Sequence, residues 1–164
     1  MKEQDKDNYT LSQFGYVLCK IQLLENYDPS WELPKYQHLG DAGFDLRCAI
    51  NEPVTIKSGQ TELIPCGFKI ELQPGFQLEI RTRSGLAYKY GLIVLNSPGT
   101  VDSSYRGEVK VILHNLGKSD YVLRKGDRIA QGVITTYYKA CFEPTNKLTP
   151  TERDSGGFGS TDIT

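Results

Sequence analysis

The 164-residue sequence lacks several features that each mark a class of protein. Its 19 basic residues are matched by 20 acidic ones, so it has no positive surplus of the kind that duplex-binding proteins use. It contains no apolar run near the roughly 20 residues that cross a bilayer, and its polar start lacks the apolar centre of a secretory signal. We therefore expect a cytoplasmic protein that binds neither nucleic acid nor membranes, with nuclear placement open for a eukaryotic or viral source.

Cysteine is sparse and scattered. The chain has Cys19, Cys48, Cys66 and Cys141, with no Cys-x-x-Cys pair among them. This spacing argues against a zinc site or a redox motif and favours isolated buried thiols in a reducing compartment. A chain of this length buries enough surface to fold without disulfides or a structural metal, and the length predicts one domain.

Helical periodicity is nearly absent, and short segments rich in Val, Ile, Leu, Thr and Tyr fill the chain instead. In Phe76–Arg81 apolar residues alternate with polar ones, which is the period of a half-buried strand. Strands are predicted over Tyr16–Leu24, Phe44–Cys48, Val54–Ile56, Thr61–Leu72, Phe76–Thr82, Leu92–Leu95, Glu108–Asn115, Tyr121–Leu123 and Arg128–Tyr138. The one predicted helix is Ser84–Tyr90, with Ser84 as N-cap and Gly91 as its stop. Many short strands with almost no helix predict an all-β fold, either an antiparallel barrel or a jelly-roll-like sandwich.

Composition divides the chain into three parts. Residues 1–15 form a polar N-terminal extension, residues 16–140 carry the predicted strands, and residues 141–164 form a C-terminal arm. The arm contains two prolines and the run Gly156-Gly-Phe-Gly159, which is too flexible for a core strand. We expect the arm to be disordered alone and to order on something else.

Three segments carry charged or amide side chains that suggest chemistry, and each also has a plain structural interpretation. Asp41 and Asp45 flank a glycine-bent segment that could hold a hydrated divalent cation or could form an Asx-type turn. Arg83-Ser-Gly opens the predicted helix, where unpaired N–H groups, a hydroxyl and a guanidinium favour an anion; an ordinary N-cap beside a surface arginine is the alternative. Gln131 closes a charged turn that begins at Gly126, and its amide could hydrogen-bond a phosphate oxygen.

Two further segments are longer. Asn96–Glu108 predicts a hairpin whose tip exposes backbone groups to a planar base, with Asp102 as a general base and Tyr105 as a flat face for a sugar. A hairpin with an acidic turn residue and a core tyrosine is the plain interpretation. In Arg153–Thr161 the glycines would let backbone N–H groups wrap around phosphates, although a flexible glycine-rich tail is also common.

The order of these segments resembles the five-motif pattern of the trimeric dUTP nucleotidohydrolases, the dUTPases. The motifs are Asp-Ala-Gly-x-Asp-Leu, Arg-Ser-Gly-Leu-Ala, Gly-x-Val-Asp-x-x-Tyr-Arg-Gly-Glu, Gly-Asp-Arg-Ile-Ala-Gln and Arg-x-x-Gly-Gly-Phe-Gly-Ser-Thr, and the match runs from about Val17 to Thr161. The resemblance implies a jelly-roll-like β-barrel with one short helix that assembles as a homotrimer, with active sites at subunit interfaces and a mobile C-terminal arm closing over the nucleotide. The implied reaction is Mg²⁺-assisted attack of water on the α-phosphorus of dUTP, giving dUMP and pyrophosphate. It would limit uracil incorporation into DNA and supply dUMP for dTTP synthesis.

The resemblance also implies roles for residues of this sequence. Asp102 matches the carboxylate that activates the attacking water, and Asp45 matches the one that holds Mg²⁺ through its water shell. Tyr105 matches the residue packed under the deoxyribose, and Phe158 matches the ring that stacks over uracil. The other implied substrate-binding residues are Arg83, Ser84, Gly85 and Gln131 around the phosphates, Asn96, Gly99 and Val101 at the uracil edge, and Arg153, Gly159, Ser160 and Thr161 in the arm.

The sequence departs from the family pattern at two positions of the arm. Asp154 and Asp162 stand where the family often has glycine, and each adds a carboxylate near the implied γ-phosphate site. The alternatives to dUTP hydrolysis are a dCTP deaminase of the same fold or its bifunctional variant, a trimer that serves as a regulatory binder, and a plain structural jelly-roll. Asp102-x-x-Tyr105 and the intact fifth motif favour dUTP hydrolysis.

Overall fold

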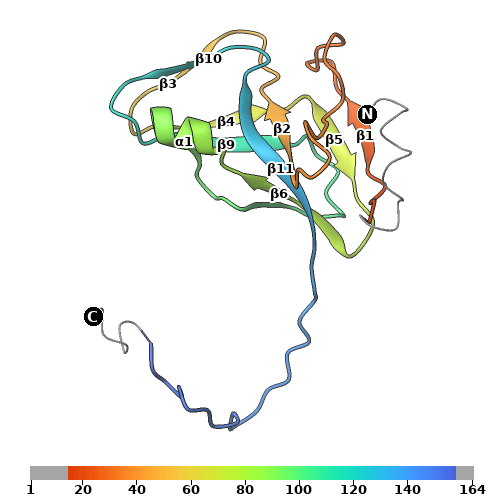
Figure 1. Cartoon of the computed structure of the whole chain (residues 1–164), viewed down its shortest axis with the longest axis vertical. Helices are drawn as coiled ribbons and strands as arrows, with labels where there is room; N and C mark the ends of the chain where they lie inside the picture. The colour runs from red at the N-terminus through yellow and green to blue at the C-terminus, as the bar shows by residue number, and fades with distance from the viewer. Residues whose placement is uncertain (1–14, 158–164) are drawn as a thin grey trace.

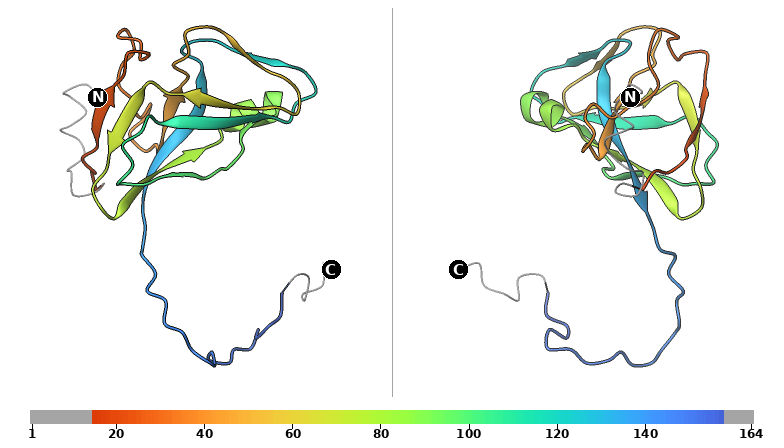
Figure 2. Two further views of the ribbon diagram at one scale, coloured as in Figure 1. Left: turned by 180° about the vertical axis from the view of Figure 1, so that it is seen from behind. Right: turned by 45° about the vertical axis from the view of Figure 1, so that its right-hand side comes forward.

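A computed structural model describes residues 15–157, and within that range the chain forms short strands and one short helix, α1 (Ser84–Tyr90) (Figure 1). The strands are β1 (Lys20–Leu23), β2 (Gly43–Arg47), β3 (Val54–Ile56), β4 (Thr61–Pro65), β5 (Phe68–Glu71), β6 (Phe76–Arg81), β7 (Leu92–Val94), β8 (Gly99–Val101), β9 (Lys110–Asn115), β10 (Tyr121–Leu123) and β11 (Arg128–Thr136). No helix in this range is long and apolar enough to span a membrane. After β11 the chain leaves the strands as an extended arm (Figures 1 and 2).

The strands pair in four antiparallel sheets. A four-stranded sheet has the order β2-β11-β6-β8, and a three-stranded sheet has the order β4-β9-β7. The pairs β1-β5 and β10-β3 complete the pairing. The prediction of an all-β fold with one short helix is confirmed, whereas the closed barrel stays a prediction because these pairings leave four separate sheets.

The larger sheet turns one face to the core and the other outward. On β2, Phe44 and Leu46 are buried while Asp45 between them points to the other face. On β6, Leu78 and Ile80 are buried in the same alternating way. Because side chains alternate along a strand, burying these apolar residues places the charged residues of the same strands on the outer face. The fold therefore brings charged residues of β2, β6 and β11 together on one surface.

Most predicted strands differ from the observed ones by one or two residues at an end, and two differ by more. Thr61–Leu72 was expected as one strand but forms β4 and β5, because the chain turns at Gly67 with a φ of 75°. A Cβ at Gly67 would lie 2.8 Å from the Ala49 Cβ, so the turn is held close against another segment. The strand predicted over Tyr16–Leu24 is shorter in the structure, where only β1 forms. Gly99–Val101, expected only as part of a hairpin tip, pairs with β6 as strand β8.

The helix ends where the sequence predicts, but its start differs. The N-cap is Arg83, and no side chain caps the first turn, so the prediction of Ser84 as N-cap was wrong. The stop at Gly91 is confirmed: its φ is 68°, and its N–H donates to the Ala87 carbonyl over 3.0 Å. A left-handed glycine after the last turn is the usual way to end a helix.

The four cysteines are all free thiols. Cys48 and Cys66 are buried, as expected, and burial raises the pKa of both thiols. Cys19 is half-buried and Cys141 is exposed in the arm, so the expectation of buried thiols was wrong for Cys141.

Candidate active site

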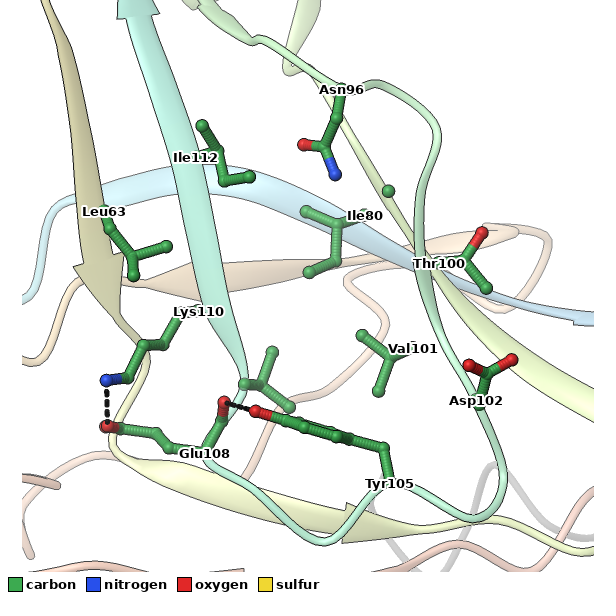
Figure 3. Close-up of a pocket in the computed structure, with 12 residues that line it drawn as sticks. Leu63, Ile80, Asn96, Thr100, Val101, Asp102, Tyr105, Glu108, Lys110 and Ile112 are labelled. Carbon is green, nitrogen blue, oxygen red and sulfur yellow. Dashed lines mark hydrogen bonds and ion pairs between the residues drawn. The ribbon is translucent and has the colours of Figure 1, made fainter.

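The third predicted motif surrounds a pocket of about 260 Å³, which we call the hairpin pocket. All five residues to which this motif assigned a role line it, together with residues of neighbouring strands (Figure 3). The lining consists of Asn96, Gly99, Val101, Asp102 and Tyr105 with Leu63, Ile80, Thr100, Glu108, Val109, Lys110 and Ile112. Thr100 and Glu108 stand in the motif without an assigned role, and the other five were missed because strand pairing, not a motif, brings them to the pocket.

Strand pairing sets the position of the hairpin. Gly99 lies opposite Ile80 in the β6–β8 pairing, so the segment after the tip is anchored to the larger sheet. A Cβ on Gly99 would be only 3.0 Å from Asn96 Nδ2, which shows that the Asn96 amide lies against the glycine backbone. Asn96 and Tyr105 lie at opposite ends of the pocket, and Asp102 lies on the loop between them (Figure 3).

Tyr105 is exposed at the rim of the pocket rather than buried in the core. The residue is 46% exposed, and its hydroxyl donates to the Glu108 carbonyl oxygen over 3.2 Å. Its ring lies directly over Gly107, where a Cβ would be 2.2 Å from the Tyr105 hydroxyl oxygen. The interpretation of Tyr105 as a core tyrosine is therefore wrong, and the ring offers a face to whatever enters the pocket.

The first, second and fourth motifs meet elsewhere, at what we call the arginine cluster: Asp45, Arg83 and Arg128. Arg83 Nε lies 2.9 Å from Asp45 Oδ1, and an Arg128 guanidinium nitrogen lies 3.1 Å from Asp45 Oδ2. Arg83 also donates to the Arg128 carbonyl oxygen over 2.8 Å. Two guanidiniums on one carboxylate leave a net positive charge on the outer face of the larger sheet, which suits an anionic ligand.

Gln131 lies beside this cluster, since it is the β11 partner of Asp45 across the β2–β11 pairing. Its side-chain amide donates to the Thr82 carbonyl oxygen over 2.9 Å. In this chain the Gln131 amide thus binds the backbone that leads into Arg83. Arg128 was not singled out from the sequence, although it stands in the fourth motif, because its partner Asp45 is far away along the chain.

The described residues contain no group of three or more His, Cys, Asp or Glu side chains that could hold a metal ion. Asp45 is the carboxylate of the arginine cluster, and its side chain is 18% exposed. A single carboxylate cannot form a protein cage, but Mg²⁺ is commonly bound through one or two carboxylates, its own waters and substrate phosphates. The residues present therefore fit a cation that arrives with a polyphosphate.

The arm carries the fifth motif, of which the structure describes the beginning. Arg153 Nε donates to the Gly156 carbonyl oxygen over 2.8 Å, and the Gly156 N–H donates back to the Arg153 carbonyl. Asp154 has a φ of 42°, which is a left-handed conformation that glycine adopts more easily. The predicted residues Phe158, Gly159, Ser160, Thr161 and Asp162 lie outside the described residues.

The predicted residues therefore fall in three separate places within one chain. The arginine cluster does not line the hairpin pocket, and the arm runs away from the strands in every view (Figures 1 and 2). Apolar side chains in and just before the arm are left exposed: Tyr138 is 100%, Phe142 90% and Leu148 80% exposed. Ser84 and Gly85 begin α1 next to the arginine cluster.

Comparisons with known proteins identify this β-structure with its hairpin pocket as that of a nucleotide hydrolase family. The dUTPase family model matches residues 29–162. The chain is 53% identical over 144 residues to the deoxyuridine 5'-triphosphate nucleotidohydrolase of Rickettsia felis, covering 88% of this chain and 96% of that protein. It is 51% identical to the Rickettsia canadensis protein of the same name, covering 94% and 99%. The chain belongs to the dUTPase family, and it is a dUTP diphosphatase, a hydrolase.

Solved structures agree on the fold. The dUTPase of Staphylococcus bacteriophage 80alpha with dUPNHPP superimposes with a TM-score of 0.78 at 22% identity, covering 89% of this chain and 99% of that one. A mutant dUTPase from phage phi11 of S. aureus, whose structure describes the coordination of a structural Mg(II) ion, gives a TM-score of 0.70 at 20% identity, covering 81% and 99%.

Proposed function

We propose that the enzyme converts dUTP to dUMP and pyrophosphate by attack of water on the α-phosphorus, with Asp102 as the general base. The observation that carries this proposal is the hairpin pocket, which gathers Asn96, Asp102 and Tyr105 around one cavity of about 260 Å³. An amide can pair with a base, a carboxylate can activate an attacking water, and an aromatic face can pack against a pentose. The hydrolysis would keep uracil out of DNA and supply dUMP for dTTP synthesis.

Uracil would bind at the tip of the hairpin. The Asn96 amide and the backbone of Gly99 and Val101 offer donors and acceptors to the edge of the base. We propose that the tip has no room for a 5-methyl group, so that thymine is refused. Because a buried polar group left unpaired is costly, a pattern that suits the uracil edge rejects cytosine.

Asp102 would act on the attacking water. It is exposed on the loop that follows β8, beside the pocket. The carboxylate accepts one proton of the water while the water oxygen bonds to the α-phosphorus. The bond between the α-phosphorus and the oxygen that bridges it to the β-phosphorus then breaks, which releases pyrophosphate. A positioned carboxylate typically contributes a rate factor of about 10²–10⁴.

The triphosphate would bind at the arginine cluster. Arg83 and Arg128 supply the positive charge, with Ser84, Gly85 and Gln131 as further donors. Asp45 would hold Mg²⁺ through water, because one carboxylate beside bound phosphates is enough for this cation. When bound, Mg²⁺ would neutralise charge on the triphosphate and make the α-phosphorus easier to attack.

A complete site would need several copies of the chain, which we propose form a homotrimer of closed jelly-roll-like barrels. Three observations support this assembly: the hairpin pocket and the arginine cluster are separate, the arm leaves its own strands, and apolar side chains in and just before the arm are exposed. Seating this segment on another copy would bury Tyr138, Phe142 and Leu148. It would also bring Arg153, Phe158, Gly159, Ser160 and Thr161 to a nucleotide held by other chains.

Substituting Gly107 with alanine tests whether Tyr105 contacts the nucleotide. The new Cβ would lie 2.2 Å from the Tyr105 hydroxyl oxygen, so the ring or its loop must shift. Because a displacement of about 1 Å near a reacting centre costs about 10²-fold in rate, we expect kcat/KM for dUTP to fall by about that factor. Gly40→Ala is the matched control, since nothing lies within 4 Å of a Cβ there. Unchanged kcat/KM in Gly107→Ala would remove Tyr105 from the site.

Parallel turnover assays with dUTP and dCTP test the proposed reaction. We expect pyrophosphate from dUTP and no ammonia from dCTP. Release of ammonia from dCTP would instead show a deaminase of the same fold, and binding of both nucleotides without turnover would show a regulatory binder.

A further inference from the structure

Glu108 stands out among the residues of the hairpin pocket because its carboxylate is largely withdrawn from solvent. Its side chain is 17% exposed. One oxygen, Oε1, accepts hydrogen bonds from Asn26 Nδ2 at 2.9 Å and from the Gly67 N–H at 3.0 Å. The other oxygen, Oε2, lies 3.7 Å from Lys110 Nζ at the rim. Nothing in the proposed reaction uses this carboxylate.

The donors to Glu108 come from segments remote in sequence. Asn26 Nδ2 also donates to the Ala49 carbonyl oxygen at 3.1 Å, so this side chain ties three parts of the chain together. Gly67 turns between β4 and β5 with its N–H directed at Glu108. Gly67 packs closely against Ala49 and Tyr27, since a Cβ there would lie 2.8–3.0 Å from them. Glu108 is therefore bound to a closely packed part of the fold.

Tyr105 rests on the backbone that Glu108 fixes. The Tyr105 hydroxyl donates to the Glu108 carbonyl oxygen over 3.2 Å, a contact visible at the base of the pocket (Figure 3). Its ring covers Gly107, the residue immediately before Glu108. Because Tyr105 is 46% exposed, burial does not fix the ring, and its position follows the loop beneath it.

We propose that Glu108 and Asn26 form a clamp that positions Tyr105 and thereby sets the discrimination between deoxyribose and ribose. This inference rests on the proposed function, in which Tyr105 packs against the sugar. If the backbone holds the Tyr105 ring in one position, the ring excludes a 2′-hydroxyl by steric contact. If the loop is loosened, the ring can move and a ribose can bind. Removing the carboxylate would also leave the Asn26 and Gly67 donors without their acceptor, which drives the loop to rearrange.

The test compares kcat/KM for dUTP and for UTP in folded variants. In Glu108→Ala we expect the dUTP/UTP ratio to fall about tenfold or more, the effect of losing a hydrogen-bonded charged group, with KM for dUTP changing more than kcat. Glu108→Gln keeps an oxygen for Asn26 and Gly67, so its ratio should stay within about threefold of wild type. Glu52→Ala, at an exposed carboxylate outside the pocket, is the matched control.

Asn26→Ala loosens the clamp from the other side, at a residue that does not line the pocket. It should lower the ratio in the same direction, and it decides the question alone if Glu108→Ala does not fold. Wild-type ratios in folded Asn26→Ala and Glu108→Ala would overturn the clamp, as would an equal loss of selectivity in Glu108→Gln and Glu108→Ala. A wild-type enzyme that does not prefer dUTP over UTP would overturn the role of Tyr105 itself, and the clamp would fall with it.

Discussion

Asp102→Asn should lower kcat for dUTP by at least about 10²–10⁴, the usual consequence of losing a general base. The amide keeps the size and shape of the carboxylate but cannot take the proton of the attacking water. The affinity for dUTP should therefore change little, and the loss should appear in kcat rather than in KM. Steady-state release of pyrophosphate measures both parameters.

Asp120→Asn is the matched control for this substitution. Asp120 accepts a hydrogen bond from the Ser58 N–H at 3.1 Å in a turn outside the hairpin pocket, and the amide oxygen of asparagine can still accept it. This variant should keep wild-type kinetics. Turnover at the wild-type rate in Asp102→Asn would exclude Asp102 from the mechanism.

Deleting the chain from Arg153 onward should largely abolish turnover while preserving the folded protein. Residues 137–157 contain no strand or helix, and the described part of the deleted segment, residues 153–157, holds none of the buried core. Ordering an arm costs roughly 1–2 kcal/mol per residue, so closure must be driven by contacts to bound nucleotide. Arg153 would gain a charge-assisted contact, and Phe158 a stacking face, only when the site is filled.

Three measurements check the truncation: the melting temperature, the mass in solution and pyrophosphate release.

In the full-length chain, Phe158→Trp adds a second tryptophan as a fluorescent reporter. The native one is Trp31, whose ring packs edge-on against Tyr27 with the ring centroids 5.2 Å apart. The fluorescence of the variant should respond strongly to a non-hydrolysable dUTP analogue and less to dUMP, which lacks the distal phosphates. Full activity of the truncated chain would refute closure by the arm. Equal fluorescence changes with the dUTP analogue and with dUMP would show that Arg153 does not contact the γ-phosphate.

Local pattern was enough to predict most strands. The alternation in Phe76–Arg81 predicted β6, and Gly91 predicted the end of the helix. The break at Gly67 was missed because the apolar residues on both sides were read as one strand, although Pro65 and Gly67 are themselves a local turn signal. The sequence does not show that Gly67 packs closely against Tyr27 and Ala49.

The site was predictable where a motif is continuous in sequence. Asn96, Asp102 and Tyr105 were predicted together and lie around one pocket. Arg128 and Glu108 stood in quoted motifs without an assigned role, because their partners Asp45 and Asn26 are 83 and 82 residues away. The pairing of a carboxylate with a remote side chain is a property of the fold.

Hydrolysis of dUTP in water enriched in ¹⁸O tests the central claim most directly. If water attacks the α-phosphorus, mass spectrometry should find the heavy oxygen in dUMP and none in pyrophosphate. Label in pyrophosphate would place the attack on the β-phosphorus and contradict the reaction proposed for this site.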